Sequence, residues 1–343
     1  MGQQRKGRAV YLQLADQLRE QMKTGELQPG EMLPSESKMM QQYSVARLTV
    51  RAALDVLVAE GLVEKRQGKG SFCRFPSGKK RIHVLLNVTD YYFVPYYIQG
   101  IGKALRRNGA EFVALDTYDS NDEISSCLEK MEQNESDGVI VQISPKDGFD
   151  RERLTTALEG LSARGIPYIM IDTVYDFLPG SYVTVGEMQA GALAAQCFLK
   201  HGHTKTAGVG VAQDDTSRQR MEGFSAAMPV QGIYHVKDGW EEALLGAIRS
   251  GVTGLFCFND YVAKQTLDLV TAAGISVPEE ISIISVDDTV ISEIYHLTSV
   301  SHPKSVIGEA AAEALLSGSL PFYKEYIPRL VERNSVKQLA GER

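Results

Sequence analysis

The chain has 343 residues but only four cysteines, and it lacks any hydrophobic run close to 18 residues long. Cys73, Cys127, Cys197 and Cys257 are far apart and form no Cys-x-x-Cys pair. We therefore expect small buried side chains in a reducing compartment rather than disulfides. Without a long apolar run we expect no membrane-spanning helix. The basic N-terminus is not followed by an apolar segment, so we expect no secretory signal and a cytoplasmic protein.

The chain also lacks the common catalytic motifs. It contains no Gly-x-Ser-x-Gly, no zinc-binding cysteine set and no Walker A motif. His201 and His203 form a weak metal signal, because no third ligand lies near them in the sequence. Asp287 and Asp288 are sequence neighbours that point in different directions, so their spacing does not make an acid–base pair. We expect no catalytic residue, no metal, no cofactor and no enzymatic activity.

Positive charge is concentrated at one end of this acidic chain. The whole chain carries a net charge of -7, yet residues 1–81 hold 15 Lys and Arg against 8 Asp and Glu. The remaining residues are therefore strongly acidic. Such asymmetry is typical of nucleic-acid binding, because a basic segment gains free energy by releasing counterions from phosphates. An acidic body does not bind DNA indiscriminately.

Residues 10–72 predict a small helical domain that ends in a hairpin. Apolar residues at every fourth position from Val10 to Met22 predict an amphipathic helix. Ser35 is well placed as the N-cap of a second helix, and Gly61 ends a third. The expected elements are helices over residues 10–23, 35–43 and 46–60, then a hairpin over residues 62–72 with a flexible tip.

The third helix is the expected recognition helix of a DNA-binding domain. Arg47, Thr49 and Arg51 lie in its first turns, which face the major groove when such a helix docks end-on. Arginine can pair with guanine O6 and N7, and threonine can contact a thymine or a phosphate. The glycines of the tip let the backbone approach the sugar–phosphate chain, and Lys69 can enter the minor groove. The predicted DNA-binding residues are Ser35, Arg47, Thr49, Arg51, Gln67, Gly68, Lys69 and Gly70.

Residues 10–72 resemble the GntR-type winged helix-turn-helix, through stretches that include VARLTVRAAL and EGLVEKRQGKGSF. The resemblance implies binding to a double-stranded, pseudo-palindromic operator as a homodimer. Two residues depart from the family pattern. Ser37 replaces the arginine that often follows Pro-Ser-Glu, and Ala46 replaces the Ser or Thr before the recognition arginine. Ala46 loses an N-cap worth about 1 kcal/mol and a phosphate contact, which bears on the operator sequence.

The rest of the chain alternates between strand-like and helical patterns. The expected strands cover residues 82–88, 112–115, 138–143, 168–171, 206–211, 254–258 and 281–286. The expected helices cover residues 94–108, 121–134, 151–164, 187–201, 216–228, 240–250 and 260–273. This rhythm predicts βαβ units with parallel sheets, arranged as two α/β lobes. We expect an α/β protein with a winged helix-turn-helix domain at 1–73, a basic linker at 74–81 and a two-lobed domain at 82–343.

Polar and aromatic residues follow the predicted strands, where open α/β sheets bind ligands. Carboxylates accept hydrogen bonds from paired hydroxyls, a guanidinium donates two, and a ring covers the apolar face of a sugar. We interpret Arg220 and Asp287 as ligand-binding, and Asp260 as the N-cap of the helix that follows it. The candidates are Asp90, Tyr91, Phe93, Asp172, Arg220, Asn259 and Asp287.

Residues 82–317 resemble the sensor domain of LacI/GalR-type repressors, which has the periplasmic sugar-binding-protein fold. Matching phrases include SRQRMEGFSAAM, LFCFNDYVAKQTLDLV and LTSVSHPKSVIGEAAAEALL. The resemblance implies ligand roles for Arg220, Asn259 and Asp287, and less directly for Asp172 and His302. Gly186-Glu187 replaces the usual aspartate or asparagine at the start of the Gly-Ala helix, so that ligand contact is in question.

The union of a GntR-type head with a LacI-type sensor is similar to the arabinose-responsive repressors, the AraR family. It implies a repressor of L-arabinose (pentose) utilisation genes that releases its operator when the sugar binds. Such a protein is cytoplasmic, and associated with the nucleoid while bound to DNA. Other interpretations stay open: an activator, a sensor of another sugar, a purine or a phosphorylated ligand, or a cytosolic sugar-binding protein without gene regulation.

Overall fold

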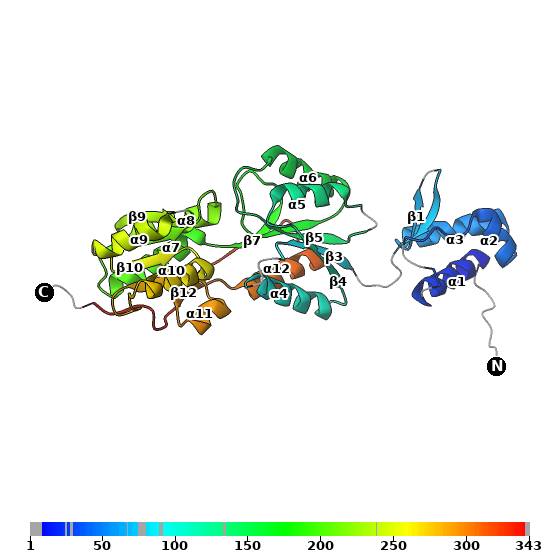
Figure 1. Cartoon of the computed structure of the whole chain (residues 1–343). Coiled ribbons are helices and arrows are strands. Elements are labelled where there is room, and N and C mark those ends of the chain that lie inside the picture. The colour runs from blue at the N-terminus through cyan, green and yellow to red at the C-terminus, as the bar shows by residue number, and fades with distance from the viewer. Residues whose placement is uncertain are drawn as a thin grey trace. The chain divides into compact units, whose positions relative to one another are not determined.

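The computed structural model describes residues 9–24, 26–27, 30–66, 68–74, 80–88, 92–132, 135–237 and 239–339. The chain forms two compact units (Figure 1). The first extends to Arg81 and includes Glu132–Asp137, and the second holds Ile82–Met131 and the chain from Gly138 onward. Within the described residues, no helix is both long enough and apolar enough to cross a membrane.

The first unit contains three helices and a hairpin in the predicted order. Its elements are α1 (Val10–Thr24), α2 (Glu36–Tyr43), α3 (Arg47–Ala59), β1 (Val63–Arg66) and β2 (Gly70–Cys73). The apolar stripe of α1, which includes Leu14 and Leu18, joins Leu54 and Leu57 of α3 in one buried core. The i, i+4 spacing in α1 and the i, i+3 spacing of Leu54 and Leu57 in α3 place these residues on one helix face, as the sequence predicted.

The hairpin forms the wing. Strands β1 and β2 pair antiparallel, and Met32 bridges to Phe72 from the segment before α2. At the tip, Gly68 and Gly70 have φ angles of 72° and 117°. Residues other than glycine rarely adopt such backbone angles, so the tip conformation depends on these two residues.

The second unit consists of two α/β lobes, each built on a six-stranded sheet. In the first lobe the strand order is β13-β7-β6-β5-β3-β4. The strands are β3 (Arg81–Leu86), β4 (Glu111–Asp116), β5 (Gly138–Ile143), β6 (Tyr168–Asp172), β7 (Ser181–Val185) and β13 (Tyr323–Tyr326). The helices are α4 (Val94–Arg107), α5 (Asn121–Lys130), α6 (Arg151–Ala163) and α12 (Lys304–Ser317). Helices α4 and α12 cover one face of the sheet and α5 and α6 the other (Figure 1).

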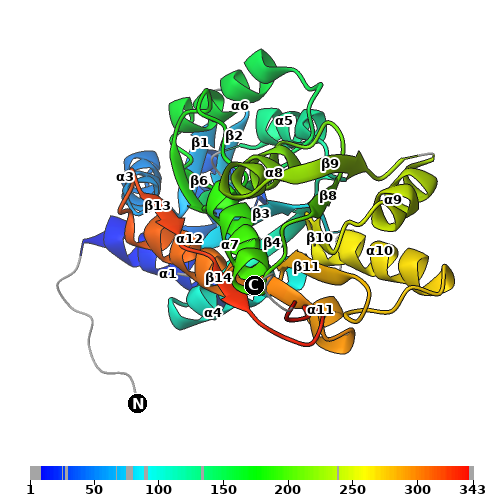
Figure 2. The same ribbon diagram turned by 90° about the vertical axis from the view of Figure 1, so that its left-hand side faces the viewer.

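The second lobe repeats this plan with strand order β14-β12-β11-β10-β8-β9. Its strands are β8 (Thr206–Gly210), β9 (Val230–His235), β10 (Gly254–Cys257), β11 (Ser282–Asp287), β12 (Thr298–Ser301) and β14 (Arg329–Val331). Its helices are α7 (Glu187–Lys200), α8 (Asp215–Ala227), α9 (Trp240–Arg249), α10 (Asp260–Ala272) and α11 (Val290–Ile294). Helices α7 and α8 lie together on one side, with α9 and α10 across the sheet (Figure 2).

The chain passes between the lobes at three places in the described residues. It crosses from β7 to α7 through Gly186, from β12 to α12 through His302-Pro303, and from β13 to β14 through residues 327–328. Glu187 and Lys304 are therefore the first helical residues after two of these crossings. Their side chains lie at the hinge of the cleft.

The element boundaries differ from the predictions in a few places. Helix α5 ends at Lys130 rather than 134, because Met131 is extended (ψ 125°) and the polar run after it has no apolar face. Strand β3 begins at Arg81, inside the predicted linker, and ends at Leu86. The periodicity did not predict β7, β9, β12, β13, β14, α11 or α12. Several of these are short or edge strands with polar residues, which leave no continuous apolar run.

Helices α7 and α8 touch through their backbones. A Cβ atom on Gly191 would lie 1.9 Å from the Arg220 carbonyl oxygen, and one on Gly223 would lie 1.9 Å from the Met188 carbonyl oxygen. No side chain fits between the helices at these points. The close approach places Glu187, at the start of α7, directly beside Arg220 on α8.

We predict that Gly191→Ala destabilises the protein by about 1–3 kcal/mol, because the added methyl group overpacks this contact. The matched control is Gly246→Ala on α9, where a Cβ meets nothing within 4 Å. There alanine should stabilise by about 0.5–1 kcal/mol through helix propensity. The single tryptophan, Trp240, reports urea unfolding of the full chain by fluorescence. Equal effects of the two substitutions would contradict the proposed backbone contact.

Candidate functional site

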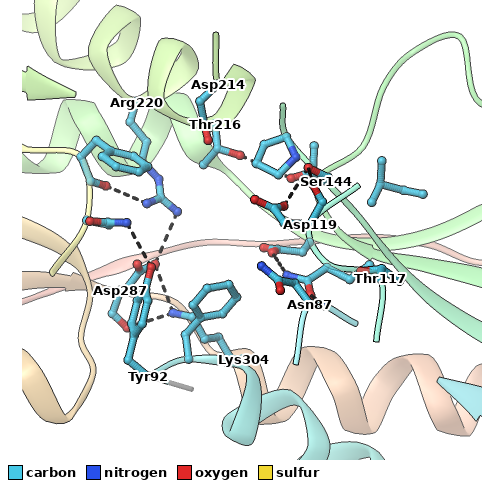
Figure 3. Close-up of a pocket in the computed structure, with 18 residues that line it drawn as sticks. Asn87, Tyr92, Thr117, Asp119, Ser144, Asp214, Thr216, Arg220, Asp287 and Lys304 are labelled. Atoms are coloured by element: carbon cyan, nitrogen blue, oxygen red, sulfur yellow. Dashed lines mark hydrogen bonds and ion pairs between the residues drawn. The ribbon is translucent and has the colours of Figure 1, made fainter. Parts of the chain in front are cut away.

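A cavity of about 180 Å³ lies between the two lobes at the carboxyl ends of their strands (Figure 3). Both lobes line it with polar groups. The first lobe supplies Asn87, Thr117, Asp119, Gln142, Ser144 and Thr173, and the second supplies Asp214, Thr216, Arg220, Asn259 and Asp287. Drug-sized ligands usually occupy roughly 300–1,000 Å³, so this cavity suits a smaller polar molecule.

Arg220 is buried and donates three hydrogen bonds to two protein groups. Its Nε donates to Glu187 Oε2 at 2.5 Å, its Nη2 to Glu187 Oε1 at 3.2 Å, and its Nη1 to the Phe258 carbonyl oxygen at 2.7 Å. Burial lowers the pKa of the guanidinium, but the Glu187 and Asp287 carboxylates outweigh it and the net shift is upward. Among its contacts with described residues, one Nη1 hydrogen remains for a ligand.

Asp287 joins the two lobes through Lys304. The Lys304 Nζ donates to the Asp287 backbone oxygen at 3.0 Å and to its Oδ1 at 3.3 Å. Arg220 Nη2 lies 3.5 Å from the same Oδ1. Figure 3 shows both cations meeting this carboxylate beside the cavity. Lys304 begins α12 of the first lobe and Asp287 ends β11 of the second, so this is an ion pair across the hinge.

His302 lies behind the cavity rather than in its lining. Its ring is buried and its Nδ1 lies 3.4 Å from Arg220 Nη2. Burial, and then the charges of Arg220 and Lys304, lower the pKa of His302 well below its usual value. The ring is therefore neutral and Nδ1 can accept from Arg220. In this structure His302 supports Arg220, although the sequence predicted contact with the effector.

Asn259 both lines the cavity and caps α10, the role that the sequence assigned to Asp260. The Asn259 Oδ1 accepts from the Val262 amide and caps α10, while its Nδ2 donates to the Tyr92 hydroxyl at 3.2 Å across the cleft. The interpretation of Asp260 as the N-cap was therefore wrong. Asp260 is fully buried, and its oxygens accept from hydroxyls of three residues. They are Ser285, Thr289 and Ser299.

Two further candidates, Asp172 and Phe93, lie on the side of the first lobe. Asp172 accepts from the Tyr97 hydroxyl and from Gln142 Nε2, each at 2.8 Å, and faces the cavity. Phe93 also lines the cavity. Asp90 and Tyr91 lie outside the described residues. The structure thus brings five predicted residues to one cavity, and their binding of an effector stays a prediction.

Glu187 is the group that sequence reasoning did not place. Burial raises its pKa to about 7, against the opposing charge of Arg220. At the position where the chain departs from the family pattern, Glu187 forms hydrogen bonds with Arg220. Glu187 does not line the cavity. Asn87, Asp119, Gln142, Ser144 and Lys304 were also missed. The first four follow or end strands, so the strand-end rule could have found them; Lys304 had no such signal.

The histidine pair does not form a metal site. His201 Nδ1 contacts the Cys197 carbonyl oxygen, whereas His203 contacts Thr253 and the Lys337 carbonyl oxygen. Among the described residues, Cys197, His201 and Glu332 do have ligand spacing. However, Lys200 pairs with Glu332 at 2.8 Å, and burial raises the pKa of the Cys197 thiol to about 11. Both features oppose a cation.

The head presents its predicted DNA-binding residues on the surface. Arg47 and Arg51 are exposed, and Glu36 lies 3.8 Å and 3.0 Å from their Nε atoms. The Ser35 Oγ accepts from the Lys38 amide and so caps α2, whereas Ala46 provides no cap to α3. Thr49 is half-buried beside the two arginines. Gly68, Lys69 and Gly70 form the exposed wing tip, and Gln67 lies outside the described residues.

Comparison with known proteins matches both parts of the chain. Residues 10–73 match the model of bacterial regulatory proteins of the gntR family, and residues 195–336 match that of the periplasmic binding protein-like domain. The chain joins a GntR-type DNA-binding head to a periplasmic-binding-protein-like sensor. This confirms the two family resemblances and the α/β fold class.

Relatives of this architecture match almost the whole chain. An arabinose metabolism transcriptional repressor from Halalkalibacterium halodurans is 29% identical over 97% of this chain and 98% of its own. A protein of the same name from Geobacillus stearothermophilus is 28% identical over 96% and 98%. The fold of a LacI family transcriptional regulator from Enterococcus faecium with bound ribose is similar, with a TM-score of 0.60 and 22% identity. This structural match covers 76% of this chain and 100% of the Enterococcus faecium chain.

We predict a pH dependence of sensor stability that Glu187 causes. Its pKa in the folded sensor is about 7, above the roughly 4.3 of an unfolded glutamate. Between these values the unfolded chain binds fewer protons, so the free energy of unfolding falls as the pH rises, by about 1 kcal/mol per unit. The difference in unfolding free energy between parent and Glu187→Gln, followed by Trp240 fluorescence, should show this slope from pH 5 to 7. A flat difference would mean that Arg220 keeps Glu187 ionised throughout.

Proposed function

We propose that this chain represses genes for the use of L-arabinose or a related pentose, and that it releases operator DNA when the sugar fills the interlobe cavity. The observation that carries this proposal is a DNA-binding head joined to a cavity lined on both sides by amide, hydroxyl and carboxylate groups. The full-length match to arabinose metabolism repressors supports the choice of sugar. Such a protein acts in the cytoplasm, where the chromosome lies, and requires no enzymatic activity.

The charges of the cavity favour a neutral polyhydroxylated ligand. Both cations that line it, Arg220 and Lys304, already face carboxylates. Asp119, Asp172 and Asp214 add negative charge to the lining, although burial raises the pKa of Asp214. A phosphate would have no unpaired cation among the lining residues and would meet these acids. Sugar hydroxyls can instead donate to the carboxylates and accept from the free Arg220 hydrogen.

Contacts across the cleft provide the means by which a sugar changes the sensor. The Asp215 amide of one lobe donates to the Pro145 carbonyl oxygen of the other at 2.8 Å. Lys304 and Asp287 join the lobes on the hinge side. A sugar bound to both lobes strengthens this closed arrangement, because its hydrogen bonds exist only when the lobes meet. Hinge closure of this kind is a common source of allosteric switching.

We propose a homodimer as the functional unit. One recognition helix contacts too few base pairs to specify a site, and a two-fold dimer matches a pseudo-palindromic operator. Sugar-induced closure then changes the spacing of the two heads. By linkage, operator DNA must weaken sugar binding by the factor by which sugar weakens DNA binding, typically about 1–3 kcal/mol of coupling.

We predict that Arg47→Ala and Arg51→Ala each weaken operator binding by about 1–3 kcal/mol, because each removes a contact to a base. Lys69→Ala should weaken binding to all sequences and reduce the log–log salt slope by about one unit. Fluorescence anisotropy over a salt series measures both effects and the expected two chains per operator. Arg249→Ala, an exposed change on the sensor, is the control. Parent-like binding by all three head variants would show that these residues do not contact DNA.

We predict that L-arabinose releases the operator and that Asp287→Asn raises the sugar concentration needed at least tenfold. A charged hydrogen bond lost from a buried site costs roughly 1.5–3 kcal/mol. We prefer this change to Arg220→Ala, which would leave Glu187 buried without its partner, whereas Asp287→Asn keeps the backbone oxygen that Lys304 contacts. Asp268→Asn, an exposed change on α10, is the control.

Calorimetry with L-arabinose, D-xylose, D-ribose, arabinose 5-phosphate and adenine tests the ligand class. Binding of the phosphate or of the purine in place of every neutral pentose would refute the proposed effector. Tighter operator binding upon addition of sugar would indicate an activator or a co-repressed regulator instead.

A further inference from the structure

Leu48 is an exposed apolar residue on the recognition helix. It lies in the first turn of α3 between Arg47 and Thr49, and 79% of its surface is accessible. The core face of α3 is formed by Val50, Leu54 and Leu57, all at most 1% exposed. At 100° per residue, Leu48 falls on the opposite face, together with Arg51 three positions later. Leu48 thus lies on the exposed face of α3, the face expected to dock on DNA.

The surroundings of Leu48 are charged. The side chains of Arg47 and Arg51 are 57% and 55% exposed, and Glu36 stands beside both. Leu48 is more exposed than Val10, Met32 or Val58, the other large exposed hydrophobic residues described in the head. An isolated exposed leucine is common on proteins. One that lies between two arginines in the first turn of a recognition helix occupies a position that contacts base edges.

We propose that Leu48 recognises a thymine in each operator half-site by packing against its C5-methyl group. This rests on the proposed DNA binding of the head. In the major groove the thymine methyl is the apolar group that a base pair presents, whereas the other edge atoms are hydrogen-bond donors and acceptors. A leucine cannot hydrogen-bond to those atoms, so its apolar contact selects thymine. The flanking Arg47 and Arg51 supply contacts to neighbouring positions.

The experiment replaces thymine by deoxyuridine, which removes only the methyl group. The parent protein first selects its operator from a random DNA library. Each thymine of that operator is then replaced in turn, symmetrically in both half-sites, and affinity is measured. Losing one buried methyl contact changes an equilibrium constant about fourfold. At one thymine position of the half-site, deoxyuridine should therefore weaken binding about fourfold for each half-site that is changed. Leu48→Ala should bind the thymine operator more weakly and show little further loss with deoxyuridine at that position.

Two variants make the assignment specific. Thr49→Ser removes the other nearby methyl group on the helix, and Val58→Ala removes an exposed apolar side chain far from its first turn. Both should retain the parent's sensitivity to deoxyuridine. The proposal is overturned if Leu48→Ala keeps the full sensitivity, if Thr49→Ser alone abolishes it, or if no thymine of a selected operator is sensitive. If the parent selects no DNA sequence at all, the proposed regulatory function itself fails.

Discussion

The sensor depends on a chain of buried charges that runs from Glu187 through Arg220 and Asp287 to Lys304. These side chains are only 5–10% exposed, so each ion would lose several kcal/mol of hydration if it stood alone. Each therefore has to meet an opposite charge. Their pairing fixes the position of α8 against α7, and of β11 against the start of α12. Arg220, Asp287 and Lys304 of this chain of charges form part of the cavity wall.

The crossings between the lobes explain why these charges lie where they do. Glu187 follows the crossing at Gly186, and Lys304 follows the crossing at His302-Pro303. From these positions at the hinge, Glu187 reaches Arg220 on the neighbouring helix α8, and Lys304 reaches Asp287 at the end of β11. Lys304 belongs to one lobe and its partner Asp287 to the other. Separating the lobes would leave Lys304 without its carboxylate, whereas Asp287 would keep Arg220 of its own lobe, so the pair favours the closed arrangement.

Buried ion pairs are weak evidence for stability, since apolar residues of similar size often stabilise a fold equally well. Their placement at a hinge favours a switching role. A carboxylate such as Asp287 can accept hydrogen bonds from a sugar hydroxyl and from Lys304 at the same time. Sugar binding and lobe closure therefore both depend on hydrogen bonds to the same carboxylate. Because the pKa of Glu187 is about 7, the charge of this group of residues changes within the physiological pH range.

The sequence predicted most of the architecture, because its main determinants are local. The period of four in α1, the Ser35 cap, the wing glycines and the continuous apolar strands each follow from backbone geometry and burial. Side-chain pairing was harder to predict. Glu187 and Arg220 are 33 positions apart, and only the contact of α7 and α8 through Gly191 and Gly223 joins them. Nothing in the sequence near Asp260 showed that three hydroxyls from other elements would surround it. The polar strand β12 gave no apolar run although it is fully buried, and β14 has only three residues, which is too short to show a period.

Charged residues are also paired on the exposed surface of the head. Glu36 lies beside both Arg47 and Arg51, so it offsets part of the positive charge that would otherwise attract any phosphate. If these arginines contact bases as proposed, a specific site must offer contacts that replace Glu36, and guanine O6 and N7 can do so in the fixed geometry of a base edge. Non-specific DNA offers only phosphates and leaves the carboxylate facing a negative backbone. An acid that weakens phosphate contacts more than base contacts therefore favours the sequence that offers the best base contacts, which is specificity through an unfavourable alternative.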